Sequence, residues 1–136
     1  MQVGILYATK KKAVQEAAES LRQGLEEQGH TVKLFPDDEG SFGALGACRN
    51  IIVGSCVTAL FKPRTPKKLA SALVKAPGLA GKRSIAFLAG GGVSERKALS
   101  ALMRDMEKQG CYLVDQRSFS SKQEAYEFGR QAELKT

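Results

Sequence analysis

Short apolar runs alternate with amphipathic segments along the whole chain. Each run is four to six residues long, which is the length of a strand and too short for most helices. Several runs are apolar at consecutive positions, which is typical of parallel strands buried on both faces. We therefore predict five strands, at residues 3–7, 30–35, 50–55, 84–88 and 111–114.

Apolar residues at spacings of three and four predict four helices, one after each strand except the second. In the first helix, Ala13, Ala17 and Leu21 recur at every fourth position, and Gly29 marks the end. Each helix follows a residue whose side chain can cap the first amides. These predicted capping residues are Thr9, Thr65, Ser94 and Ser121.

The alternation of strands and helices predicts the fold class. It is typical of an α/β protein in which helices cover both faces of a parallel sheet. Five strands in 136 residues fit a three-layer, doubly wound sheet with the strand order 2-1-3-4-5. No repeat or linker interrupts the pattern, so we expect residues 1–136 to form a single domain.

Three loops are expected to meet at one edge of this sheet. Right-handed crossovers place the loops after the first, third and fourth strands at the carboxyl edge, where ligands bind in such folds. The loop after the second strand, with Asp37 and Asp38, opens at the same edge but to one side. The three loops are residues 9–13, 55–64 and 89–93.

The first of these loops leads from a buried strand into a helix N-terminus. Backbone amides and the helix dipole at such a place favour an anion, and the loop adds a hydroxyl and positive charge. One interpretation is a phosphate cradle. The other is a solvated lysine run, because no glycine frees the backbone to wrap a phosphate. The candidate residues are Thr9, Lys10, Lys11, Lys12 and Ala13.

The other two loops offer small polar side chains and glycines. Hydroxyl groups can bond the edge of a ring, and glycines allow the backbone to approach a flat or phosphorylated ligand closely. The same glycine run would also suit a connection that needs positive φ angles. The candidate residues are Ser55, Cys56 and Thr58 in the second loop and Gly90, Gly91 and Gly92 in the third.

The charge of the chain narrows the choice of partner. The net charge of +7 favours anionic partners, and nine of the 21 lysines and arginines lie in or beside the three loops. We do not expect nucleic acid as a partner, because the arginines and aromatics that read single strands are not interleaved here.

The histidine and cysteine content argues against a catalytic triad, a metal site and a disulfide framework. His30 is the only histidine and lies away from the loops, so no catalytic residues and no transition-metal site are expected. The widely spaced Cys48, Cys56 and Cys111 suggest buried, reduced thiols. No apolar run is long enough for a membrane span and no signal peptide is recognisable, so we expect a cytoplasmic protein.

The chain resembles the flavodoxin family over nearly its whole length. The resemblance rests on the strand 3–7 with Thr9 behind it, on the strand that ends at Ser55, on Pro63 before the next helix, and on the small residues 89–92. It implies that FMN binds at the three loops, that the first loop holds the FMN phosphate, and that the protein carries electrons.

The first loop of flavodoxins usually reads Ser/Thr-x-Thr-Gly-x-Thr. Thr9 matches its first hydroxyl, whereas Lys11, Lys12 and Val14 stand at the remaining positions of the motif. The aromatic side chains that commonly flank the flavin in the second and third loops are replaced by small residues.

The sequence therefore leaves two functions open. The first is a flavodoxin-like electron carrier or oxidoreductase that binds FMN and meets an acidic redox partner protein. The second is a divergent, non-enzymatic module that has lost FMN. It would bind another anion or an acidic partner protein at its basic loop edge.

Overall fold

A computed structural model of the chain describes residues 1–59 and 61–135. The strands are β1 (Gln2–Tyr7), β2 (Thr31–Pro36), β3 (Asn50–Ser55), β4 (Arg83–Ala89) and β5 (Tyr112–Phe119). The helices are α1 (Lys12–Glu27), α2 (Lys67–Lys75), α3 (Glu95–Lys108) and α4 (Lys122–Gln131), with a short 3₁₀ helix η1 (Gly43–Ala47). Within the described residues, no helix has the length and apolar character that crossing a membrane requires.

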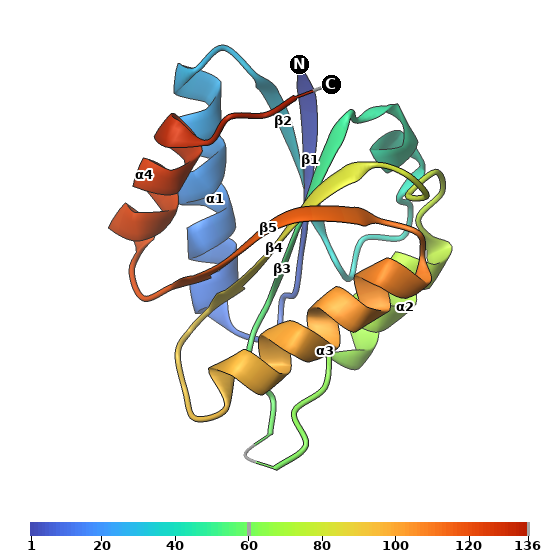
Figure 1. Cartoon of the computed structure of the whole chain (residues 1–136), viewed down its shortest axis with the longest axis vertical. Coiled ribbons are helices and arrows are strands. Elements are labelled where there is room, and N and C mark those ends of the chain that lie inside the picture. Colours follow the sequence, from blue (N-terminus) through green and yellow to red (C-terminus); the bar gives the residue numbers. More distant parts are fainter. Residues whose placement is uncertain (60, 136) are drawn as a thin grey trace.

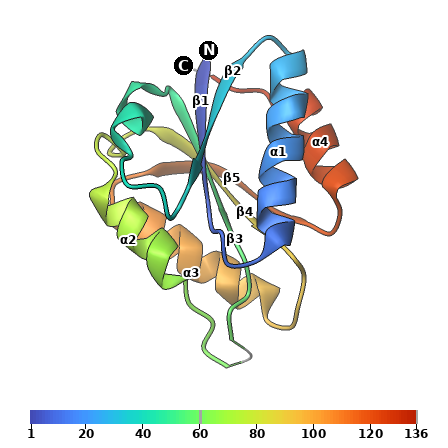
Figure 2. The ribbon, with the colours of Figure 1, turned by 180° about the vertical axis from the view of Figure 1, so that it is seen from behind.

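The predicted three-layer architecture is confirmed. The strands form one parallel sheet in the order β2-β1-β3-β4-β5. Helices α1 and α4 cover one face, and α2 and α3 cover the other (Figure 1; Figure 2). Because α1 and α2 leave the sheet on opposite faces, the ends of β1 and β3 form the switch point at which folds of this kind bind ligands.

The central strands are stable because both of their faces are covered. All residues of β3 are buried, as are all residues of β1 after the first. Gly54 in β3 makes room for a neighbour, since a Cβ atom there would overlap the ring of Phe87 on the paired strand β4. Packing on both faces thus fixes the positions of the strand ends that carry the loops.

Helices α1 and α4 approach closely at two glycines. A Cβ atom on Gly129 would lie 2.5 Å from the carbonyl oxygen of Leu21, and one on Gly24 would overlap the carbonyl oxygen of Tyr126. The side chain of Gln28 also donates to the carbonyl oxygen of Gly129, at 2.6 Å. The backbones of the two helices therefore touch directly, which holds α4 against α1.

For two of the four helices, the predicted capping residue is wrong. Helix α1 follows Lys11 instead of Thr9, whose side chain is bonded elsewhere, and α2 follows Pro66 instead of Thr65. The residues before α3 and α4 are those predicted. Ser121 accepts a hydrogen bond from the backbone amide three residues ahead, at 3.2 Å, as a capping side chain should.

The last strand is longer than its apolar run suggests. It continues to Phe119, beyond the predicted end at Val114. The pairing with β4 skips Val114, which is the extra residue of a β-bulge. Because β5 is an edge strand with exposed positions, polar residues continue it without any apolar pattern that a sequence could reveal.

The three cysteines lie inside the protein. Cys48, Cys56 and Cys111 are all buried and free, and their predicted burial is confirmed. Burial raises the pKa of each thiol, so all three stay protonated at neutral pH.

Candidate functional site

The ends of β1, β2 and β3 are tied together beyond the strands themselves. The amide of Ala8 donates to the carbonyl oxygen of Gly54 at 3.0 Å, and the amide of Asp37 donates to that of Tyr7 at 2.9 Å. These bonds continue the parallel ladders, so the segments after the three strands begin side by side at the carboxyl edge.

Thr9 is bound by a carboxylate of the protein itself. Its hydroxyl donates to Oδ1 of Asp37 at 2.7 Å, and its amide donates to the same oxygen at 3.2 Å. Asp37 is only 6% exposed. The two donors of Thr9 that the sequence suggests for a phosphate are therefore directed at an internal anion.

The glycine loop after β4 lies close to both other loops. Gly90, Gly91 and Gly92 have φ angles of 96°, 63° and 118°, which is why glycine suits all three positions. A Cβ atom on Gly90 would lie 3.5 Å from Cδ of Lys11, and one on Gly92 would lie 3.6 Å from Cβ of Val57. The loop thus packs against its neighbours at ordinary van der Waals distances.

The residues at the end of β3 are enclosed by the protein. Ser55 and Cys56 are buried, and the Ser55 hydroxyl is 3.5 Å from the carbonyl oxygen of Cys56. Burial raises the pKa of the Cys56 thiol, although nearby Lys11 and Lys10 oppose the rise. The protonated, buried thiol is a poor nucleophile.

A hydrogen bond crosses the loop between β3 and α2: the hydroxyl of Thr58 donates to the carbonyl oxygen of Arg64 at 3.1 Å. Lys62 adopts a left-handed conformation, with a φ angle of 50°. The ring of Phe61 is 83% exposed. The loop therefore presents an aromatic ring and several cations to solvent.

A cavity of about 860 Å³ lies between this loop, the start of α2 and the end of β1. Its volume is typical of sites for small molecules, which span about 300–1,000 Å³. Three threonines and one carboxylate, that of Asp37, are part of the wall. The cationic residues of the wall are Lys10, Lys62, Arg64, Lys67 and Lys68.

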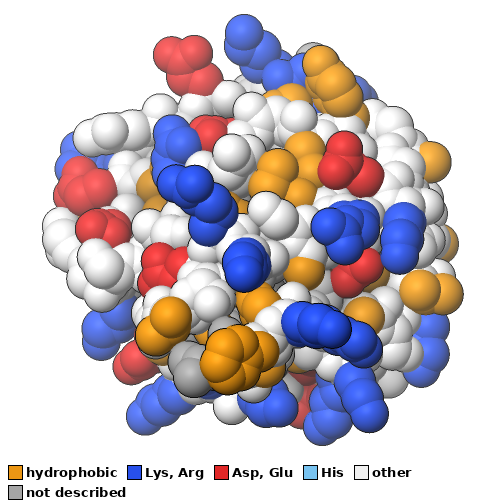
Figure 3. All heavy atoms as spheres, turned by 60° about the horizontal axis from the view of Figure 1, so that its bottom comes forward, with side chains coloured by type: hydrophobic (Ala, Val, Ile, Leu, Met, Phe, Trp, Pro, Cys, Tyr) orange, Lys and Arg blue, Asp and Glu red, His pale blue; other side chains and the backbone are white. Residues whose placement is uncertain are grey.

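The charges of this region face solvent. All five cationic residues of the cavity wall are exposed. Figure 3 brings the carboxyl edge of the sheet forward and shows lysine and arginine side chains spread over this face, with acidic side chains among them. The excess of cations at the cavity favours an anionic ligand, through an attraction that salt weakens.

The N-terminus of α2 opens onto the same cavity without a capping side chain. The first hydrogen bond of the helical pattern runs from the amide of Ala70 to the carbonyl oxygen of Pro66, at 2.9 Å. Just before the helix, Thr65 lines the cavity and is 7% exposed. Among the described residues, none offers a hydrogen-bond partner to its buried Oγ1.

The structure separates the predicted site residues into two groups. Thr9, Lys10 and Thr58 line the cavity. The others do not: Lys11 and Ala13 lie against the glycine loop, and the three glycines themselves lie outside this cavity wall. Lys12 is exposed at the start of α1, and the two residues at the end of β3 are buried.

Several residues of the cavity were not among the predicted site residues. Asp37 could have been found from the strand register, since Tyr7 pairs with Pro36 and the next residues are therefore neighbours. No signal in the sequence distinguishes Thr65 as a hydroxyl without a partner, because the same residue suits a helix cap. The remaining residues are Ala59, Phe61, Lys62, Arg64, Pro66, Lys67 and Lys68.

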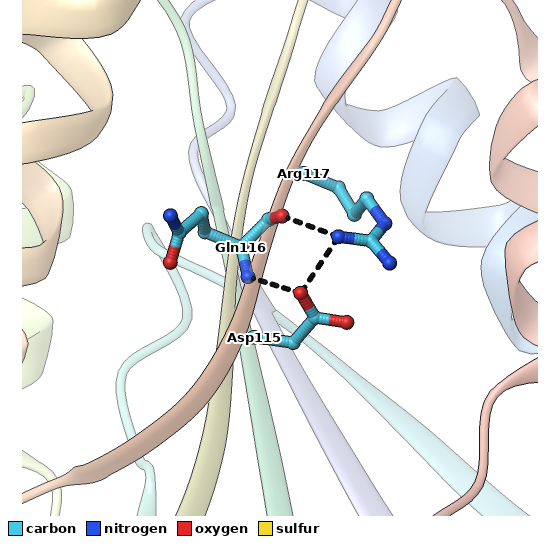
Figure 4. Close-up of polar contacts among 3 residues, drawn as sticks. All are labelled: Asp115, Gln116 and Arg117. Carbon is cyan, nitrogen blue, oxygen red and sulfur yellow. Dashed lines mark hydrogen bonds and ion pairs between the residues drawn. The ribbon is translucent and has the colours of Figure 1, made fainter.

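A second hollow, beside β5 and α4, is lined by groups that bind one another. Asp115 accepts hydrogen bonds from the amide of Gln116 at 2.8 Å and from Nη1 of Arg117 at 2.7 Å (Figure 4). The guanidinium of Arg117 also lies 5.1 Å from the ring centre of Phe128. These contacts are typical of a polar edge strand and do not indicate a ligand.

Comparison with known proteins identifies the fold. No family model and no curated protein sequence matches the chain. Among solved structures, the chain is similar to oxidised flavodoxin 1 from Bacillus cereus, with 14% identity, 95% of each chain covered and a TM-score of 0.72. It is also similar to the flavodoxin of Streptococcus pneumoniae TIGR4, with 16% identity, coverage of 96% of this chain and 94% of that chain, and a TM-score of 0.76. At such identities the likeness shows a flavodoxin-like fold, and the ligand has to be argued from the site.

The first loop does not fit the FMN phosphate that the resemblance implies. Both donors of Thr9 bond Asp37, and a carboxylate so close to a phosphate would repel it. The loops that flank the flavin in flavodoxins touch each other here, where Val57 lies against Gly92. The cations and the cavity volume lie instead on the α2 side of the switch point.

Proposed function

We propose that this protein binds a small molecule with a phosphate group and a flat apolar part, in the cavity between the β3–α2 loop and the end of β1. The observation that carries the proposal is the charge of the cavity wall, where five cations outnumber one carboxylate. Cations that converge on a concave site of ligand size favour phosphate over neutral ligands.

The exposed ring of Phe61 supports the apolar part of the ligand. It lines the cavity and is 83% exposed. An aromatic face can stack on a flat ring, a contact worth about 0.5–1.5 kcal/mol beyond the area it buries. The cations and the ring together suit a phosphorylated ring compound, such as a nucleotide.

Calorimetric titration with FMN, riboflavin and ADP tests the proposal. We expect at least one of the two phosphorylated probes to bind, and riboflavin to bind about tenfold more weakly than FMN, because it lacks the phosphate. Raising the ionic strength should weaken binding of the phosphorylated probes. If neither phosphorylated probe binds at millimolar concentration, or if FMN binds and riboflavin binds as tightly, the proposal fails.

A matched pair of variants in α2 separates site binding from general charge. Lys68→Gln removes a cation from the cavity wall, whereas Lys75→Gln removes an exposed cation at the other end of the same helix. We expect the first variant to lose affinity by about threefold to tenfold and the second by less than twofold. Equal losses would mean that only the net charge of the protein matters.

The flavodoxin-like fold favours a second candidate function. The chain covers about 95% of the flavodoxins it resembles. In this case the protein would bind FMN and transfer electrons to an acidic partner protein that meets its basic edge. Purified protein should then quench the fluorescence of micromolar FMN, and absence of quenching would exclude this candidate while leaving the first open to ADP.

A further inference from the structure

Among the helix N-termini at the carboxyl edge of the sheet, those of α1 and α2 differ in what lies in front of them. In front of α1, Oδ1 of Asp37 takes the hydroxyl and the amide of Thr9. Asp37 is itself buried. An anion that approached this loop would meet a fixed negative charge and would find two of its donors in use.

The N-terminus of α2 opens onto the cavity instead. Like that of α1, its first turn contains no acidic residue, and no side chain of the described residues caps it. The amides of Lys67, Lys68 and Leu69 precede the first amide bonded within the helix, that of Ala70. Such amides, together with the positive end of the helix dipole, favour an anion.

A second observation at α2 points to a ligand. Thr65 lines the cavity immediately before the helix, is more than nine-tenths buried, and has no hydrogen-bond partner for Oγ1 among the described residues. A buried hydroxyl without a partner destabilises the folded protein, and such groups are rare in native structures unless a ligand or water completes their hydrogen bonds. A rotation about its χ1 angle exchanges the hydroxyl and methyl positions and can offer the donor to a ligand oxygen.

We propose that the phosphate of the ligand sits at the N-terminus of α2, on the hydroxyl of Thr65 and the first amides of the helix, and not at the first loop. This inference rests on the proposed function, because it locates the phosphate of the proposed ligand. Arg64 and Lys68 flank this position on the cavity wall and supply the countercharge. The phosphate would thus bind at the helix after β3, whereas the flavodoxin resemblance places it at the loop before the helix that follows β1.

Amide chemical shifts of the ¹⁵N-labelled protein, titrated with inorganic phosphate at constant ionic strength, test the inference directly. We expect saturable shifts at residues 65–69, and shifts at residues 9–14 that are small by comparison. Saturable shifts centred on 9–14 would refute the inference but would support the proposed function. The absence of saturable shifts anywhere would refute both.

Matched variants give an independent readout. Thr65→Val keeps the size of the side chain and removes the hydroxyl, and we expect it to weaken phosphate binding about tenfold, since a hydrogen bond to a charged group is lost. Lys12→Gln alters the first residue of α1, outside the cavity wall, and should change affinity by less than twofold. Melting curves without phosphate check that Thr65→Val folds at least as stably as the wild type. Unchanged phosphate affinity in a folded Thr65→Val protein would overturn the inference.

Discussion

The contact between Asp37 and Thr9 can be measured by a double-mutant cycle. Thr9→Val removes the hydroxyl that donates to Asp37 at 2.7 Å, and Asp37→Ala removes the acceptor of both that bond and the 3.2 Å bond from the amide. The carboxylate is 6% exposed, so water can replace these bonds only in part. The two changes therefore perturb a largely buried polar contact.

The expected magnitudes follow from this geometry. A hydrogen bond to a charged group contributes about 1.5–3 kcal/mol, and Thr9 is partly exposed, so we expect Thr9→Val to destabilise the fold by about 1–2 kcal/mol. Asp37→Ala breaks both bonds and leaves two donors unsatisfied, so we expect a loss of about 2–4 kcal/mol. The double variant should be about 1–2 kcal/mol more stable than the sum of the single effects predicts.

Urea denaturation followed by far-ultraviolet circular dichroism measures these free energies of unfolding. Single effects that add to within about 0.5 kcal/mol would refute the reasoning, because they would mean that the two residues do not interact. A third variant, Asp37→Asn, keeps an oxygen acceptor for Thr9 and removes the charge. We expect it to raise phosphate affinity by no more than about fivefold, the effect of one like charge at 4 Å in a water-like environment.

Three further predictions concern the fold. Gly129→Ala should destabilise the protein by about 1–2 kcal/mol in urea denaturation, because the overlap with the backbone of Leu21 outweighs the gain in helix propensity. Gly40→Ala, which adds a methyl group in open space, is the control, and a stabilised Gly129→Ala protein would contradict the packing of α1 on α4. Burial, with the charge of the N-terminal ammonium, lowers the pKa of His30 below 6.5, so the unfolded chain takes up the proton first as pH falls. The contribution of His30 to stability should therefore be complete above pH 6.5 and be lost as the pH falls from there through the lower pKa of the folded state. Melting temperatures measured from pH 7 to pH 5 should fall more steeply in the wild type than in His30→Gln. Parallel plots of melting temperature against pH for the two proteins would disprove this. Ser121→Ala should destabilise the fold by about 1 kcal/mol through loss of the α4 cap, whereas a melting temperature equal to that of the wild type would show that water caps the helix as well.

The periodicity of the sequence was sufficient to predict the architecture. Apolar runs buried on both faces identify the central strands, and the helical spacing between them leaves a doubly wound sheet as the arrangement that covers every apolar face. The apolar pattern did not predict the second half of the last strand, where polar residues predominate. The polar half of β5 follows Val114 at an edge with one open side, where pairing needs no apolar period.

The site was predictable only at the level of loops. Strand order by itself brings the segments after β1, β3 and β4 to one edge, because parallel strands with right-handed crossovers all end on the same side. Which side chains face a ligand there depends on contacts between segments far apart in the chain. The position of Thr9 in the sequence suits a helix cap, yet its hydroxyl donates to the carboxylate of Asp37, which lies 28 residues further along the chain.

The position of the cavity also depends on contacts that the sequence alone does not reveal. The sequence by itself determined the fold class, the excess of positive charge and the loops that carry it, since these depend on composition and on repeats of a few residues. Only the tertiary structure decided that the loop before α1 binds an internal carboxylate through Thr9, while the N-terminus of α2 opens onto a cavity beside the unpartnered hydroxyl of Thr65. Hydrogen bonds act over about 3 Å, so their pairing is set by how the layers pack and not by the order of residues along the chain.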